Sequence, residues 1–240
     1  MKTALIPAAA CALALTGAYT LYCWFPHREK PARRKRRVLC VGDSITFGAG
    51  VVYTRWRDSY PAILSRLLGN RVQVLNYGIS GATAQAGTDS PYRAAFRAAA
   101  AKTEPELCVL MLGTNDSKPH NWNGERYEKA VRAWVVEMKR YLTRPRIILA
   151  VPPKAFSVKG KPIVYAIRDE VIRDEIRPIL YRLAQSEGVE MVDFYEATKE
   201  HPEYFADGVH PNAAGNLEIA HVLYQHIIST SEDRSREEAR

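Results

Sequence analysis

The chain has 240 residues, 47% of them hydrophobic, which is enough to build one sizeable folded domain with an appendage. The net charge is +8, but residues 1–37 hold eight basic side chains against one acidic side chain, a net +7. The remaining 203 residues therefore have a net charge of only +1. They also lack a zinc-binding or helix-turn-helix signature, so we expect no nucleic-acid partner.

Residues 1–26 form an apolar segment. No charged side chain occurs from Thr3 to Pro26, so this stretch is long enough to cross a bilayer as a hydrophobic helix. We predict a single uncleaved membrane anchor. The alternative is a cleaved secretory signal, with Thr16-Gly17-Ala18 as the cleavage site, which would leave a secreted or periplasmic protein.

A basic linker follows at residues 27–36. Basic residues next to a membrane segment favour the cytoplasmic side, whereas a secreted enzyme would normally avoid them. The side of the membrane on which the domain works therefore stays open. The alternative without a role in topology is a solvated linker that contacts anionic lipid headgroups.

Residues 37–230 read as one domain in which short buried strands alternate with helices. The predicted strands are Arg37–Val41, Val72–Tyr77, Leu107–Leu112, Arg146–Val151 and Val189–Asp193. The predicted helices are Tyr60–Leu68, Pro91–Lys102, Glu125–Leu142, Val171–Glu187 and Ala213–Ile228. This alternation predicts a doubly wound α/β sheet with right-handed crossovers, in which ligands bind beyond the carboxyl ends of the strands. Residues 231–240 are predicted to be a charged, frayed tail.

Cysteine usage predicts no disulfide framework in this domain. Cys40 and Cys108 both fall inside apolar strand-like runs, where a cysteine behaves as a small core residue.

The first polar block, Gly42-Asp43-Ser44, directly follows the first predicted strand. Ser44 is a candidate nucleophile because its hydroxyl would sit in a tight turn at the ligand edge of the sheet. Read alone, the three residues are an ordinary turn. A phosphate-binding loop is a second alternative, but the run up to Gly48 lacks the lysine of that motif.

His210 is the candidate base. It lies three residues after Asp207, which can reach the other ring nitrogen, fix the tautomer and stabilise the imidazolium. The alternative is a plain turn before the last helix. His221 and His226 lie on that helix and are predicted to be surface or half-buried residues without a catalytic role.

Two further blocks offer donors for a developing oxyanion. Gly78 lets the backbone approach a substrate, and Asn115 supplies a neutral amide donor just after the third strand. Asp43 and Asp116 are interpreted as acceptors that brace their loops. The alternative for the Asn115 block is a loop whose asparagine only caps its own backbone.

The ordered set Gly42-Asp43-Ser44, Gly78, Gly113-Thr114-Asn115-Asp116 and Asp207-Gly208-Val209-His210-Pro211 resembles the SGNH hydrolases, also called GDSL esterases and lipases. The resemblance covers about residues 37–228. It implies a flavodoxin-like, three-layer α/β/α sandwich with a five-stranded parallel sheet. It also implies Ser44 as nucleophile, His210 as base and Asp207 as its orienting acid, with an oxyanion hole formed by the Ser44 and Gly78 amides and the Asn115 side chain.

The stretch from Gly113 to Trp122, with the ending Asp207 to Asn212, is similar to sialate O-acetylesterase-like and other carbohydrate acetylesterases. This resemblance favours hydrolysis of a short acyl ester, an O-acetyl group on a sugar, through an acyl-enzyme and without metal or cofactor. Lys118, His120 and Trp122 are candidates for the substrate side, Trp122 by stacking on a sugar. The alternative for Trp122 is packing at a helix entrance.

Other functions stay open at this stage. A lysophospholipase-like or thioesterase-like enzyme would cleave a lipid ester or thioester. A metal-dependent hydrolase would use Asp43, Asp116 and Asp207 as oxygen ligands. A membrane-tethered binding protein would have no activity.

Overall fold

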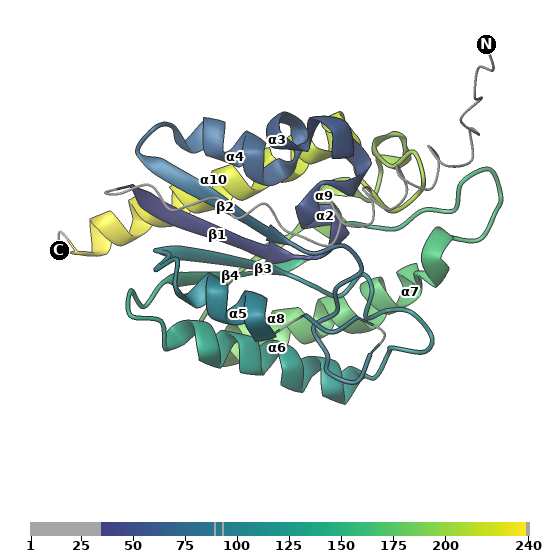
Figure 1. The fold of residues 1–240 in the computed structure, drawn as a ribbon, viewed down its shortest axis with the longest axis horizontal. Coiled ribbons are helices and arrows are strands. Elements are labelled where there is room, and N and C mark those ends of the chain that lie inside the picture. The colour runs from purple at the N-terminus through teal and green to yellow at the C-terminus, as the bar shows by residue number, and fades with distance from the viewer. Residues whose placement is uncertain (1–34, 89, 93, 239–240) are drawn as a thin grey trace, which may run out of the picture.

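The computed structural model describes residues 35–88, 90–92 and 94–238 (Figure 1). The predicted N-terminal hydrophobic helix, residues 1–26, lies outside these ranges, as does the linker up to residue 34. Within the described ranges, none of the helices is both long and apolar enough to span a bilayer.

A five-stranded, fully parallel sheet with the order β2-β1-β3-β4-β5 forms the middle of the molecule. The strands are β1 (Arg36–Gly42), β2 (Val72–Gly78), β3 (Leu107–Met111), β4 (Arg146–Val151) and β5 (Glu190–Asp193). Each predicted strand is confirmed to within one residue at either end. Their apolar character follows from burial on both faces, because helices cover the sheet above and below.

Helices form the two outer layers (Figure 1). One face carries α4 (Tyr60–Leu68) and α10 (Ala213–Glu238), and the other carries α5 (Ala94–Ala101), α6 (Gly124–Lys139) and α8 (Arg177–Glu187). The shorter helices are α2 (Ser44–Phe47), α3 (Arg55–Asp58), α7 (Asp169–Val171) and α9 (Phe194–Thr198), the 3₁₀ helices η1 (Ala49–Thr54), η2 (Val164–Ala166) and η4 (Pro202–Tyr204), and a π-helical stretch η3 (Ile172–Ile176). The predicted three-layer sandwich is confirmed.

Four helix boundaries differ from the sequence predictions. Helix α5 begins at Ala94, three residues later than predicted. The predicted helix Val171–Glu187 is interrupted by the π-helical stretch η3 before α8 begins. Helix α6 ends at Lys139, so Leu142 lies in the following turn and is 91% exposed instead of joining the buried stripe. Helix α10 continues to Glu238, because glutamate and arginine are good helix formers, so most of the predicted frayed tail is helical.

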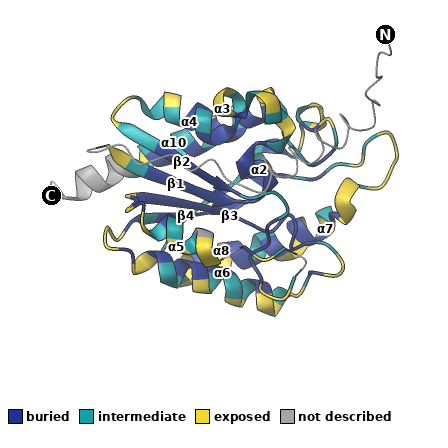
Figure 2. Cartoon of the chain, viewed as in Figure 1, coloured by how far each residue is buried: buried dark blue, intermediate teal, exposed yellow. Residues whose placement is uncertain are grey.

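Alternate residues of the strands feed two separate cores. In β1, Leu39 and Val41 pack toward α6 and α8, whereas Val38 and Cys40 pack toward α4 and α10. Figure 2 shows the strands buried and the exposed positions on the outer sides of the helices. Cys40 and Cys108 are buried in these cores, as predicted.

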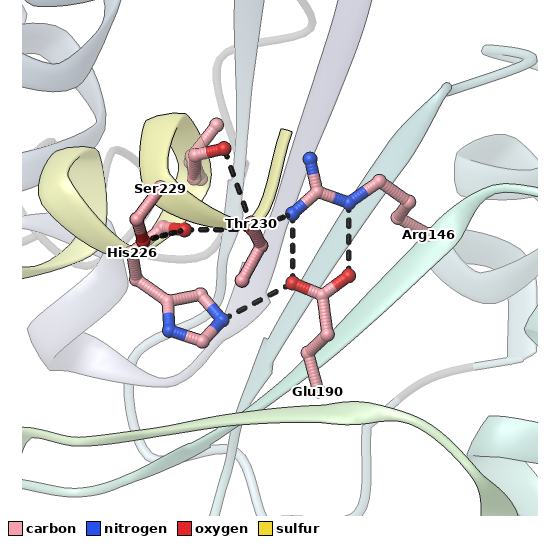
Figure 3. A network of polar contacts seen from close by, with 6 residues as sticks. Arg146, Glu190, His226, Ser229 and Thr230 are labelled. Atoms are coloured by element: carbon pink, nitrogen blue, oxygen red, sulfur yellow. Dashed lines mark hydrogen bonds and ion pairs between the residues drawn. The ribbon is translucent and has the colours of Figure 1, made fainter. Parts of the chain in front are cut away.

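A polar network joins the last helix to the amino edge of the sheet (Figure 3). Arg146 of β4 forms two hydrogen bonds of 2.8 and 2.7 Å to the Glu190 carboxylate of β5. Glu190 Oε2 also lies 3.1 Å from His226 Nε2, and Arg146 donates to the Thr230 hydroxyl; both partners are on α10. His226 therefore has a structural position far from the predicted site, in agreement with the sequence interpretation.

Candidate active site

The register of the sheet brings the ends of the first three strands together. Gly42, the last residue of β1, pairs with Gly78 of β2 and with Met111 of β3. The loops that follow these strands therefore leave the sheet at the same edge, and they contain the predicted site residues Ser44 and Asn115.

Gly42, where β1 ends and the turn begins, has no space for a side chain. A Cβ on Gly42 would lie 2.7 Å from the Met111 carbonyl oxygen and 2.1 Å from Thr46 Oγ1. Asp43 then caps helix α2 by accepting the Ile45 N–H at 2.9 Å, and Ser44 begins that helix. Ser44 is thus fixed at a helix N-terminus, and the residue is only 8% exposed.

Ser44, His210 and Asp207 form one hydrogen-bonded line. His210 Nε2 lies 2.9 Å from Ser44 Oγ, and His210 Nδ1 lies 2.7 Å from Asp207 Oδ2. The other carboxylate oxygen of Asp207 accepts the N–H groups of Val209 and His210 at 2.9 and 2.8 Å. Partial burial raises the pKa of Asp207, but these hydrogen bonds from His210 and the backbone outweigh it and hold the pKa at about 2.

The turn that carries His210 rests on the segment after β4. Gly208 has a φ of +85°, and a Cβ there would lie 2.1 Å from the Phe156 carbonyl oxygen. The Phe156 N–H donates to the Gly208 carbonyl at 2.8 Å. This glycine is therefore required both by its backbone conformation and by the close approach of the neighbouring chain.

Asn115 lies beside the Ser44 turn, as predicted. Its Nδ2 is 3.2 Å from the Ala82 carbonyl oxygen and 3.5 Å from Asp43 Oδ2. Asn121 Nδ2 donates to the Asn115 carbonyl at 3.0 Å and so fixes the backbone of this loop. The 3.5 Å contact with Asp43 is longer than an ordinary hydrogen bond, which leaves one amide hydrogen able to donate to another acceptor.

The prediction for Gly78 is wrong. The Gly78 N–H donates to Asn76 Oδ1 at 2.9 Å, so it is not free for an oxyanion. A Cβ on Gly78 would lie 2.1 Å from the Phe47 nitrogen, so this glycine serves the packing of β2 against α2. The sequence pattern marked a glycine at a strand end but did not contain the direction of its N–H.

Gly81, three residues further on, has the properties expected of Gly78. It has a φ of +81°, and in the described part of the chain its N–H has no hydrogen-bond partner. The next residue, Ala82, is the one whose carbonyl accepts from Asn115. The second glycine of the Gly78-Ile79-Ser80-Gly81 run is the signal that could have identified it.

Asp43 and Asp116 brace the loops, as the sequence indicated. Asp116 is fully buried and accepts the Ala84 and Gln85 N–H groups and Gln85 Nε2 at 2.9–3.2 Å. Burial raises the pKa of both carboxyls to about 6, against the opposing effect of these donors and, for Asp43, of the Ile45 N–H and His210. Among the described residues, no three histidine, cysteine or acidic side chains are grouped as metal ligands.

Residues 40–217 match the sequence model of the GDSL-like lipase/acylhydrolase family. The chain belongs to this family. It is 32% identical to an acetylxylan esterase of Xylanibacter ruminicola, in an alignment that covers 83% of this chain and 45% of that protein. The chain therefore spans less than half the length of this relative.

Solved structures share the fold of this GDSL-family chain. A carbohydrate acetylesterase from Sinorhizobium meliloti superposes with a TM-score of 0.67 at 19% identity, covering 82% of this chain and all of the other. The M. smegmatis aryl esterase gives 0.66 at 20% identity over 81% of this chain and 99% of its own. An acetylxylan esterase of Geobacillus stearothermophilus, solved as a catalytic mutant, gives 0.61 at 21% identity over 82% and 96%.

The substrate-side candidates of this GDSL-family chain lie in the turn that leads into α6. Lys118 is half-buried and His120 is exposed. Trp122 donates its Nε1–H to Glu175 Oε2 at 2.9 Å, and its ring centre lies 5.5 Å from that of Tyr127. Trp122 therefore matches the packing alternative.

Sequence reasoning missed Tyr165. This residue lies in the segment between β4 and α7, and its ring centre is 5.5 Å from that of the His210 imidazole. The available signal was an aromatic residue in a connection that follows a strand at the carboxyl edge of the sheet, where such connections form binding sites.

Proposed function

We propose that this chain is a serine esterase that hydrolyses short-chain acyl esters, with O-acetyl groups on carbohydrate as its substrates. The observation that carries the proposal is the line from Ser44 Oγ through the His210 ring to the Asp207 carboxylate, with distances of 2.9 and 2.7 Å. This arrangement supplies an activated nucleophile with its base and orienting acid. Family membership and the acetylxylan esterase relative support the reaction and the acyl group.

In the first step, Ser44 Oγ attacks the ester carbonyl while His210 Nε2 accepts the hydroxyl proton. The Asp207 carboxylate, with its pKa near 2, stays ionised and stabilises the imidazolium. His210 then gives the proton to the oxygen of the departing alcohol, which leaves an acetyl group on Ser44. A water molecule, deprotonated by His210, releases acetate and restores the serine.

The oxyanion would be held by three donors: the Ser44 N–H at the start of α2, the Asn115 side-chain amide and the Gly81 N–H. Gly81 takes the role that the sequence assigned to Gly78, because the Gly78 N–H is already bonded. Donors placed in advance at a largely buried site stabilise developing charge without reorganisation.

We also propose where in the cell the domain is located. Residues 1–26 are proposed to be a membrane anchor, with a cleaved signal and a secreted or periplasmic enzyme as the alternative. The described residues do not include this segment.

The test measures acid release by the full chain from acetylated xylo-oligosaccharides, 4-nitrophenyl acetate and butyrate, and lysophosphatidylcholine. We expect the acetyl substrates to be turned over, Ser44→Ala to abolish turnover, and a fluorophosphonate to label the wild-type chain but not this variant. Turnover of lysophosphatidylcholine alone would replace the carbohydrate proposal with a lipid esterase. Wild-type rates in Ser44→Ala would overturn the serine mechanism.

A further inference from the structure

Tyr165 is an exposed aromatic residue beside the proposed base. Its ring plane makes an angle of 64° with the His210 imidazole, an edge contact at 5.5 Å, and the residue is 61% exposed. In the described part of the chain the Tyr165 hydroxyl has no hydrogen-bond partner. The tyrosine is therefore not placed there by burial or by its own polar group.

The segment that carries Tyr165, residues 152–168, is attached to both halves of the site. At one end the Phe156 ring packs 5.3 Å from Phe205, and the Phe156 N–H donates to Gly208, within the turn that carries His210. At the other end Arg168 donates through Nε to the Ser117 carbonyl at 2.6 Å, next to the Asn115 loop. Tyr165 lies between these two attachments.

The backbone at Tyr165 adopts a conformation that tyrosine disfavours. Its φ is +59°, and the φ of the next residue, Ala166, is +56°, both in the left-handed region. Neither residue is buried, so packing of the side chains does not compensate for this strain. Strained residues of this kind cluster at binding sites, where the surrounding structure holds them in place.

We propose that Tyr165 binds the alcohol half of the ester by stacking its ring on a sugar, and so determines the preference for carbohydrate esters. This inference rests on the proposed esterase function. His210 must deliver a proton to the departing oxygen, so a group beside the imidazole meets the alcohol half and not the acyl half. Because Tyr165 is 61% exposed, much of its ring surface is open to an apolar sugar face.

Tyr165 replaces Trp122 as the residue proposed to stack on the sugar. Trp122 was the sequence candidate for stacking, but its indole is bonded to Glu175 and packed against Tyr127. Tyr165 has the exposed ring and the contact with His210 that Trp122 lacks.

The test compares two substrates with the same acyl group and different alcohols, an acetylated xylo-oligosaccharide and ethyl acetate. We measure kcat and KM for the full chain and for Tyr165→Phe and Tyr165→Asn. Phenylalanine keeps the ring, whereas asparagine tolerates the left-handed backbone but cannot stack. Tyr181→Asn, on α8 and hydrogen-bonded to Asp193, is the control for loss of an exposed tyrosine.

We expect Tyr165→Asn to raise the KM of the sugar ester about tenfold, a typical size for the loss of one aromatic contact, and to leave ethyl acetate within about twofold. Tyr165→Phe and Tyr181→Asn should match the wild type on both substrates.

Three results would overturn the inference. An equal loss on both substrates would make Tyr165 a positioning residue for His210, and a shifted pH profile would accompany it. Unchanged kinetics in Tyr165→Asn would remove Tyr165 from the site. If the wild-type chain hydrolyses neither the acetylated xylo-oligosaccharide nor ethyl acetate, both the esterase function and this inference fail. If it hydrolyses ethyl acetate, the esterase function holds and the kinetics of the variants test this inference alone.

Discussion

Gly78 and Gly81 are two glycines of one short run with different physical roles. Gly78 is confined by neighbouring atoms, since a Cβ would lie 2.1 Å from the Phe47 nitrogen. Gly81 has open space, with no atom nearer than 3.8 Å, but its φ of +81° suits glycine. One glycine is thus required by packing and the other by backbone conformation.

Alanine at these two positions should therefore have different effects. Gly78→Ala should lower the yield of folded protein, because β2 and α2 must separate to admit the methyl group. Gly81→Ala should fold but lose kcat, because relief of the strained φ turns the N–H away from the oxyanion. Urea unfolding and acetyl ester kinetics measure the two effects.

Gly188→Ala provides the matched control. This residue has a φ of +60° and an open Cβ position, but it lies before β5, at the edge opposite Ser44. It should show the same cost of a left-handed alanine with full kcat. Equal kcat values for all three variants would exclude Gly81 as a donor.

Asp207 should make stability depend on pH in the acid range. Its native pKa of about 2 is below the ordinary 3.8, so the ionised carboxylate stabilises the fold above about pH 4. That contribution is lost as the pH falls from about 4 toward 2. Asp207→Asn should therefore be less stable than the wild type at pH 5, and the difference in the free energy of unfolding should shrink by pH 3.

Urea unfolding at pH 5, 4 and 3 measures this difference directly. A constant difference between variant and wild type across this range would show that Asp207 has an ordinary pKa. Esterase activity of the same variant should fall by roughly 10³-fold or more at neutral pH, because the imidazole loses the acceptor that sets its tautomer.

At the scale of elements, the network in Figure 3 fastens α10 to β4 and β5 at the edge far from the site. Glu190 has three polar contacts there, two with Arg146 and one with His226, and its side chain is only 14% exposed. Glu190→Gln should lower the free energy of unfolding by about 2 kcal/mol, because Arg146 loses its charged acceptor. The kcat/KM for acetyl esters should not change.

Glu196→Gln is the comparison, since this carboxylate binds Arg177 at the surface and is 49% exposed. Solvent-exposed pairs contribute little, so this variant should unfold at the same urea concentration as the wild type. A Glu190→Gln variant with wild-type stability and altered kinetics would contradict the structural role of the network.

The elements were predictable where burial alone decides them. All five strands were located from apolar runs, because a strand buried on both faces has no other composition. Leu142 and the π-helical stretch were not predictable, since the helical period continues past the point where tertiary packing ends or distorts the helix. Helical periodicity describes a face of a helix, not its last residue.

Within the site too, residue type could be predicted from the sequence, whereas contacts between distant segments could not. The sequence indicated that Ser44, His210 and Asp207 would lie together, because each proposed role needs a particular residue type near a strand end or turn, and the three are hydrogen-bonded. Gly81, Trp122 and Tyr165 depend on where an N–H points or on what covers a ring. Those facts arise from contacts between distant segments, which no local pattern contains.

At the scale of the whole molecule, the start of the described chain and the proposed site lie at opposite edges of the sheet. The described chain enters β1 at Arg36, on the amino edge of the sheet, whereas Ser44 and His210 lie beyond the carboxyl edge. Any segment before residue 35 is therefore attached to the domain at the edge away from the proposed site.

The Ser44–His210 contact joins residues 166 positions apart in the chain. Contacts of such long range form late in folding, because loop closure must precede them, and chains of this size pass through partly structured intermediates. On dilution from denaturant, far-UV circular dichroism should therefore recover before acetyl ester hydrolysis does. Simultaneous recovery of both signals would indicate a single cooperative step.

Because of the same separation, the proposed nucleophile would report completed folding. Ser44 belongs to the first connection of the domain and His210 to the last, so only a molecule whose entire sheet has assembled can activate the serine. A fluorophosphonate added during refolding or during synthesis should label finished molecules alone. The labelled fraction would then measure the proportion of native molecules in a mixture, whereas spectroscopy gives only an average over all molecules.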